Sequence, residues 1–224
     1  MSKISLKHSG GNVVSLNSPT SAPTSADVAF KLPNADGSAN EVLKTDGSGN
    51  LGFVAQGLAG IAEFDMWYLH SNHSADASSA ILGVSGSSTI NRHTSMSNSV
   101  AQATQIGTGM TLDSSTGVFT FPNTGKYLVI NNPQIFVYGS DNAGVFTQVS
   151  TDGGGNFVSA ALPYIGNSSG SNIHSGVAFS FVDVTNTSNI KVRFKTDSLG
   201  TNSYVIGNSS YARTMFLFIR IGDT

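Results

Sequence analysis

The sequence predicts an all-β fold, and two observations lead to that prediction. First, residues 111–130 read as a turn, a strand, a tight corner and a second strand. Phe119 and Phe121 stand two positions apart, so they share one face of a strand. Second, residues that favour helices are sparse, and Glu occurs only at Glu41 and Glu63. A chain rich in Ser, Thr, Asn and Gly favours turns and strands instead.

Each part of residues 111–130 has a local physical reason. The segment from Asp113 to Gly117 has turn chemistry, because its short polar side chains bond their own backbone and its glycine accepts positive φ. Pro122 lacks a ladder donor and ends the strand. The chain turns again at residues 123–125. The next strand, at residues 127–130, is apolar on both faces, so both faces need cover.

The same residues resemble the signature of C1q/TNF-like jelly-roll domains, G-x-F-x-x-P-x-x-G-x-Y. The matching positions, together with the neighbouring Phe121, are Gly117, Phe119, Pro122, Gly125 and Tyr127. The resemblance implies a jelly-roll sandwich in which a Phe and a Tyr from adjacent strands pack together. It implies an opening strand at residues 65–69, a closing strand at residues 215–219 near a three-fold axis, and a homotrimer.

The variant present here, T-G-x-F-T-F-P-x-T-G, occurs with a Ser- and Asn-rich body and a short polar leader. In this form it is similar to heads of tailed-phage virion proteins, including those of cyanophages. The resemblance implies a non-enzymatic virion structural protein, namely a short tail fibre or adhesin for host attachment. A capsid decoration protein at a three-fold position is the alternative. A C1q/TNF-type soluble ligand is a further alternative, but it would need an export signal and a collagen repeat.

Composition and charge exclude several classes of protein. Charged residues make up 11% of the 224 residues, against about 25% in typical proteins. The formal net charge of −2 gives no electrostatic footprint for nucleic acid or an anionic membrane. There is no Cys, no apolar run of transmembrane length, and no signal-peptide core in residues 1–8. We therefore expect assembly in the host cytoplasm, location on the virion surface, and no membrane insertion.

Residues 1–60 differ from the rest of the chain, because short apolar pieces alternate with clusters of Pro, Ser, Thr, Gly and Asn. Asp36-Gly and Asp46-Gly each predict a turn between two short strands. Such pieces cannot close a core in one chain, but equivalent strands of neighbouring chains can wrap together. We expect 1–60 to be a stalk or anchoring arm that binds another virion protein of the tail or capsid, and 61–224 to be the head.

The head has a dense strand signal after a polar stretch at residues 71–109, which we expect to form long loops with edge strands. Ile190, Val192 and Phe194 alternate with cationic residues, which is typical of a half-exposed strand. Residues 152–156 predict a hairpin connection. The other expected strands are at residues 61–69, 136–138, 145–149, 157–162, 177–181, 204–206 and 215–221.

The last expected strand carries the association hypothesis. Its Met, Leu and Ile side chains point one way and its Phe side chains the other. One sandwich core covers only one face, so the second face needs a neighbouring copy. The predicted trimer contacts are Phe216, Phe218, Met215 and Leu217.

Few residues suggest ligand chemistry. Tyr164, Tyr204 and Tyr211 lie near Gly-, Asn- and Ser-rich loops and are the candidates for stacking on a host-surface glycan. His70 and His73 have no third ligand nearby, and His93 and His174 read as loop surface. Turn formation explains Asp46 and Asp152 without calcium. With no nucleophile elbow, phosphate loop or paired carboxylates, we expect no enzyme activity, no cofactor and no metal.

Overall fold

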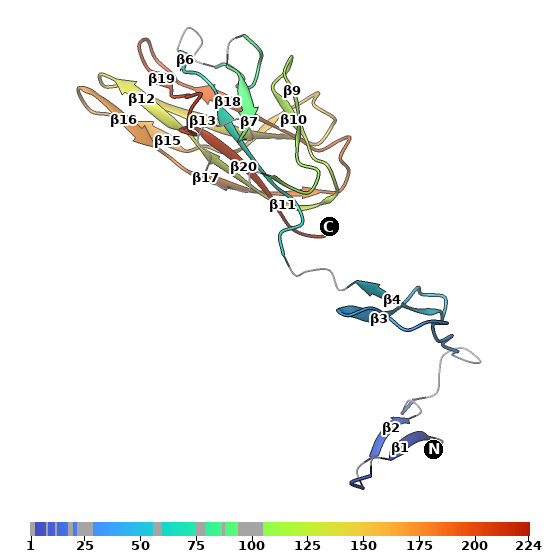
Figure 1. The fold of residues 1–224 in the computed structure, drawn as a ribbon. Helices are drawn as coiled ribbons and strands as arrows, with labels where there is room; N and C mark the ends of the chain where they lie inside the picture. The colour runs from blue at the N-terminus through green and yellow to red at the C-terminus, as the bar shows by residue number, and fades with distance from the viewer. Residues whose placement is uncertain are drawn as a thin grey trace. The chain divides into compact units, whose positions relative to one another are not determined.

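The computed structural model divides the chain into two compact units, residues 1–59 and 60–224. The residues that it describes are 3–7, 9–11, 13–17, 20–21, 29–55, 60–74, 79–86, 88–93 and 105–224. Every regular element longer than one residue in these ranges is a β-strand (Figure 1). None of the described segments forms a helix with the length and apolarity needed to cross a membrane.

The described residues of the N-terminal unit include two hairpins. β1 (Lys3–Lys7) pairs with β2 (Val13–Asn17), and β3 (Glu41–Thr45) pairs with β4 (Leu51–Ala55), both antiparallel. The turn between β3 and β4 is closed by Asp46, whose carboxylate accepts hydrogen bonds from the backbone N–H groups of Ser48 and Asn50 at 2.8 and 3.2 Å. The strands expected on either side of Asp46-Gly are therefore confirmed.

The second unit is the head, and two six-stranded sheets form its body. The first, called here the β20 sheet, has the order β17-β11-β20-β5-β7, with β8 also paired to β5. Its strands are β5 (Phe64–Leu69), β7 (Ile90–Arg92), β8 (Gln105–Ile106), β11 (Gly125–Asn132), β17 (Ala178–Val184) and β20 (Met215–Gly222).

The second sheet, called the β18 sheet, has the order β14-β13-β18-β10-β9, with β15 also paired to β13. Its strands are β9 (Thr111–Asp113), β10 (Val118–Thr120), β13 (Asn142–Ser150), β14 (Val158–Ala161), β15 (Tyr164–Gly166) and β18 (Lys191–Asp197). A smaller sheet of order β16-β12-β19-β6 contains β6 (His73–Ser74), β12 (Gln134–Tyr138), β16 (Ser171–Ser175) and β19 (Tyr204–Val205).

The strand order makes the head a jelly roll. The chain passes from β10 in one sheet to β11 in the other, and again from β17 to β18 and on to β20. Strands that are early and late in the sequence therefore lie side by side: β5 pairs with β20, and β10 pairs with β18. This interleaving of two antiparallel sheets defines the jelly roll. The expected opening and closing strands are thus confirmed as direct neighbours.

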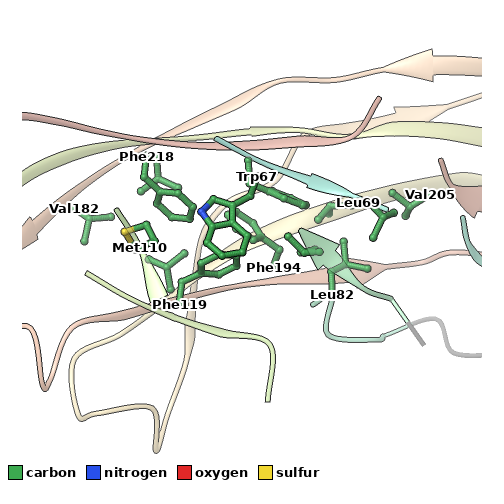
Figure 2. Packing of buried hydrophobic residues seen from close by; sticks show 14 of the residues in the cluster. Trp67, Leu69, Leu82, Met110, Phe119, Val182, Phe194, Val205 and Phe218 are labelled. Atoms are coloured by element: carbon green, nitrogen blue, oxygen red, sulfur yellow. The ribbon is translucent and has the colours of Figure 1, made fainter. Parts of the chain in front are cut away.

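The core lies between the two sheets and combines aliphatic side chains with a group of aromatic rings that contact one another (Figure 2). Phe119 lies 5.1 Å from both Trp67 and Phe218, measured between ring centroids. Phe194 of the β18 sheet stacks on Phe216 of the β20 sheet at 4.0 Å. These ring pairs join one sheet to the other.

Two predicted trimer contacts need correction for this reason. Phe216 and Phe218 are 0% and 1% exposed, so neither ring is on the surface. Phe119 and Phe194 lie opposite β20 across the space between the sheets. The Phe rings of β20, and not its aliphatic side chains, pack against them. Phe216 and Phe218 therefore belong to the core of a single copy.

The signature residues occupy positions that their chemistry explains. Gly117 has φ of +71°, and a Cβ there would lie 2.5 Å from the carbonyl oxygen of Leu82, so only glycine fits. The rings of Phe121 and Tyr127 are 4.7 Å apart, as the resemblance implied. Pro122 lies two residues beyond the last residue of β10, in the turn that leads to Gly125 and β11, so a strand end at this proline is confirmed.

Candidate association face and ligand-binding surfaces

The outward side of the β20 sheet carries a continuous arrangement of apolar side chains that are not fully buried. Cross-strand pairing aligns them in two rows of four. Residues that are direct partners point to the same side of a sheet. The first row is Phe181, Leu128, Ile219 and Phe64, and the second is Phe179, Ile130, Leu217 and Met66. We call these eight residues the association face.

The association face is only partly covered in a single copy. Phe179 and Phe181 on the edge strand β17 are 56% and 76% exposed, and the other six are half-buried. A continuous apolar surface of this kind is rare on proteins that act as monomers. Burial of one such Phe side chain stabilises a contact by about 1.5–3 kcal/mol. The face therefore favours association with another protein surface.

Two of the predicted contacts, Met215 and Leu217, do lie on the outward side of β20. Leu217 belongs to the second row. Met215 comes two residues before Leu217 on β20, so it points to the same side, and it pairs with Tyr68. In the sequence, Phe179 and Phe181 belong only to the strand expected at residues 177–181. Their partners in the rows come from β5, β11 and β20, so sequence spacing alone does not reveal the combined surface.

The β3–β4 hairpin of the N-terminal unit also lacks a core. Four of its large apolar side chains are exposed by 38–52%, namely Val42, Leu43, Phe53 and Val54, and Leu51 is half-buried. Phe30 and Leu32, just before this hairpin, are 62% and 78% exposed. A two-stranded hairpin is marginally stable in water without cover. That neighbouring chains complete the core of this segment remains a prediction.

The structure brings two of the three candidate tyrosines together. Tyr204 and Tyr211 line one depression of about 220 Å³, together with Arg213 and Asn72. Tyr204 stacks on Phe136 with 4.9 Å between ring centroids, whereas Tyr211 is 49% exposed. The guanidinium of Arg213 lies 5.5 Å from the centre of the Tyr211 ring. An aromatic ring beside a cation and an amide is a suitable surface for a sugar.

Tyr164 is elsewhere. It lies on β15 and is 46% exposed, and it pairs with Gly144 of β13. It is not among the residues that line the depression of Tyr204 and Tyr211. Arg213, by contrast, was missed by the sequence analysis, because an isolated arginine in a loop has no distinguishing pattern.

The aspartate turns are satisfied by the protein itself. Asp152 Oδ1 accepts hydrogen bonds from Ser150 Oγ at 2.7 Å and from the Asn156 backbone N–H at 2.9 Å. Asp152 Oδ2 accepts from Asn156 Nδ2 at 2.7 Å. These donors hold the pKa of Asp152 well below its usual range, because they stabilise the ionised carboxylate. The hairpin expected at residues 152–156 is confirmed.

The histidines do not form a ligand cluster. Across the described residues, no three His, Asp or Glu side chains lie together as a metal site would require. His93 is 7% exposed and packs against Tyr68 with ring centroids 5.9 Å apart, so its assignment to loop surface was wrong. Burial lowers the pKa of His93, because the charged imidazolium is less well solvated there.

Comparison with known proteins identifies similar folds rather than a family. No protein-family model matches the sequence, and no curated protein matches it. Among solved structures, the TNF protein Eiger from S. frugiperda has a TM-score of 0.46 and 11% identity, covering 72% of this chain and 94% of that chain. Murine APRIL has a TM-score of 0.48 and 12% identity, covering 71% and 98%. The jelly-roll assignment itself depends on the strand order described above.

Proposed function

We propose that this protein is a non-enzymatic, homotrimeric appendage on the surface of a tailed-phage particle. In this proposal, residues 1–60 bind another virion protein, and the head, residues 61–224, is displayed for attachment to the host surface. The observation that carries the proposal is the association face, whose two rows of apolar side chains are only partly covered in one copy.

Three further features support the proposal. The exposed apolar side chains of the β3–β4 hairpin give the N-terminal unit its own reason to associate. The C1q/TNF-like signature, from Gly117 to Tyr127, implies three copies rather than two. Its phage-like form and the Ser- and Asn-rich composition favour a virion protein.

Host attachment is supported by the depression that contains Tyr204 and Tyr211. It offers an exposed ring, a cation and amide groups within about 220 Å³. Loops that carry such groups on a rigid sheet scaffold are common binding sites. A capsid decoration protein would have the same association face, so particle location separates these two roles.

The oligomer is tested by light scattering on the full chain. We expect the mass of three chains for the wild type and a shift to single chains for Phe181→Lys. Phe181 is 76% exposed, so its replacement leaves the core of one copy intact. Tyr138→Lys is the matched control, because this exposed aromatic residue on β12 lies outside the association face. A wild-type monomer, or a trimer that persists in Phe181→Lys, would contradict the proposal.

The role is tested on particles. Labelling of the C-terminus on purified phage distinguishes a tail position from a capsid position. If the protein is an adhesin, the purified head should block adsorption of the phage to its host in a saturable manner. Capsid labelling without any block of adsorption would replace attachment with decoration.

A further inference from the structure

A groove of about 530 Å³ lies on the outward side of the β18 sheet, the sheet opposite the association face. Its floor is formed by Val118 and Thr120 of β10 and by Lys191 and Arg193 of β18. The turn that follows Asp113 and the hairpin that ends at Phe157 also line it. Pockets for small ligands commonly have volumes of 300–1,000 Å³. The groove is therefore large enough for a sugar residue.

The two cations on the floor have no carboxylate partner. In the described parts of the chain, ion pairs join only Arg92 to Asp65 and Arg220 to Asp223. Lys191 Nζ donates to Thr120 Oγ1 at 3.0 Å and to the carbonyl oxygen of Thr187 at 2.9 Å, both neutral acceptors. Neither cation is therefore neutralised by an ion pair with a carboxylate of the described residues.

Contacts within the protein fix the position of Arg193, but part of its guanidinium remains free to bind a ligand. Its Nε donates to Gln148 Oε1 at 2.9 Å, and its guanidinium carbon lies 3.9 Å from the centre of the Phe157 ring. No acceptor from the described residues bonds its two terminal nitrogens. Burial lowers the pKa of Arg193, because its charge is partly removed from water without a counter-ion. The terminal N–H groups of Arg193, which have no acceptor within the described protein, can bind the two oxygens of one carboxylate in a bidentate manner.

Asp113 is the one acidic residue among those lining the groove, and its oxygens are already engaged. Oδ1 accepts from Ser115 Oγ at 2.7 Å, and Oδ2 accepts from Thr116 Oγ1 at 2.8 Å. Two cations against one internally bonded carboxylate leave the groove with an excess of positive charge. This contrasts with the formal net charge of −2 for the whole chain.

We propose that this groove binds a carboxylate-bearing sugar, with Arg193 and Lys191 holding the carboxylate. The hydroxyl groups of Ser115, Thr116 and Thr120 also line the groove, and the ring of Phe157 forms part of its wall. The Ser115 and Thr116 hydroxyl protons are bonded to Asp113, so their oxygens would accept from a sugar hydroxyl, whereas Thr120 Oγ1 accepts from Lys191 and keeps its proton to donate. An aromatic ring contacts the apolar C–H face of a sugar. An inorganic anion would use the cations but neither of these further features.

This site goes beyond the proposed function, because it is separate from the depression of Tyr204 and Tyr211 and lies away from the association face. It shares with that proposal only the idea that the head binds glycans. A failure of sugar binding here leaves the measured oligomer mass unaffected. Conversely, a monomeric head with a functioning groove would contradict only the trimer.

The test is titration calorimetry of the full chain with glucuronic acid and N-acetylneuraminic acid. Glucose is the matched neutral probe, since it differs from glucuronic acid only in having a hydroxymethyl group in place of the carboxylate. Inorganic phosphate tests for binding of a simple anion. We expect at least one acidic sugar to bind at millimolar concentration or below, and both glucose and phosphate to bind at least about tenfold more weakly, as expected for loss of a charged hydrogen-bonded contact.

Two variants locate the site. Arg193→Gln and Lys191→Met should each weaken binding of the acidic sugar about tenfold or more. Lys195→Met is the matched control, because Lys195 lies on the same outward face of β18 but outside the groove. Circular dichroism and chain mass confirm that each variant is folded. The proposal is overturned if neither acidic sugar binds, if glucose or phosphate binds equally well, or if both groove variants bind like the wild type.

Discussion

Asp65 shows how one buried charge organises the first strand of the head. The carboxylate is 1% exposed, and its oxygens accept from Arg92 Nε at 2.9 Å and Arg92 Nη2 at 3.1 Å. The backbone N–H of Met110 donates to Asp65 Oδ2 at 2.6 Å, and Arg92 Nη2 also donates to the Met110 carbonyl. Three segments that are distant in sequence are thereby joined by one bonded carboxylate. A buried charge is tolerated only when it is paired in this way.

Glu63 makes a second buried connection of the same kind. It is 7% exposed, and its Oε1 and Oε2 accept from Asn123 Nδ2 at 2.8 Å and from the Gly109 backbone N–H at 3.0 Å. Gly109 has φ of +74°, and a Cβ there would lie 2.8 Å from Asp65 Oδ2. A residue other than glycine at this position would push the segment before β9 away from the carboxylate.

Replacing Asp65 tests this arrangement. We expect Asp65→Asn to lower the free energy of unfolding by about 3 kcal/mol, because Arg92 loses its buried counter-ion. The matched control is Asp223→Asn, which breaks the ion pair with Arg220. The Asp223 side chain is 91% exposed, so we expect a loss of less than about 1 kcal/mol. Urea unfolding followed by fluorescence of Trp67, the single and buried tryptophan, measures both values at one protein concentration. Equal losses would mean that the buried pair has no special role.

At the scale of elements, the same kind of turn, closed by an aspartate, connects strands in both units. In Asp46-Gly-Ser-Gly-Asn50 and Asp152-Gly-Gly-Gly-Asn156, the aspartate accepts from the backbone and side-chain amides of the asparagine four positions later. Asp113 closes the turn before β10 in a related way, through Ser115 and Thr116. The hydrogen bonds lower the pKa of all three carboxyl groups below the usual 3.8. These strand connections therefore depend on ionised aspartates.

This arrangement predicts a pH dependence with a definite sign. A lowered pKa in the folded state stabilises the fold when the pH is above 3.8, and this contribution is lost as the pH falls through the lower folded value. We expect the unfolding temperature of the head to fall below pH 4. The double variant Asp113→Asn and Asp152→Asn should show a shallower fall, measured by calorimetry from pH 5 to about pH 2.

Asp183→Asn is the control for that experiment. Asp183 is exposed on β17, and in the described structure its carboxylate accepts no hydrogen bond. Its replacement should leave the slope of unfolding temperature against pH unchanged. A slope that is equally steep in the double variant would exclude the turn aspartates as its cause.

For the whole molecule, the division at residue 59 makes the head testable by itself. Its core is built from residues of the second unit alone, from Trp67 to Phe218. The association face also lies entirely in this unit. The head therefore contains both its own core and the surface proposed to join three copies.

We accordingly expect residues 60–224 to fold cooperatively and to have the mass of three chains by light scattering. The truncated protein should no longer join the phage particle if residues 1–60 are the anchor. A monomeric head would show that the arm drives association. Incorporation of the truncated protein into particles would show that the anchor lies in the head.

The periodic strands and the turns could be predicted without tertiary information. β18 alternates buried Val192 and Phe194 with half-exposed cations, as the sequence pattern indicates. Asp-Gly and Asp-Ser-Ser segments determine turns locally, because the side chain bonds the adjacent backbone. The residues from Gly117 to Tyr127 indicated the fold only through their resemblance to the C1q/TNF-like signature.

By itself, the sequence indicated the all-β class, many strands and turns of the head, and a resemblance that implies a jelly roll. It did not indicate the strands β15 and β16. Only the tertiary structure decided which face of β20 is core, because both faces are apolar and the choice depends on the rings of Phe119 and Phe194 opposite them. It also decided that Asp65 is buried and that Lys191, Arg193 and Phe157 meet in one groove. These outcomes depend on which distant strands pair, and long-range pairing has no local signal in the chain.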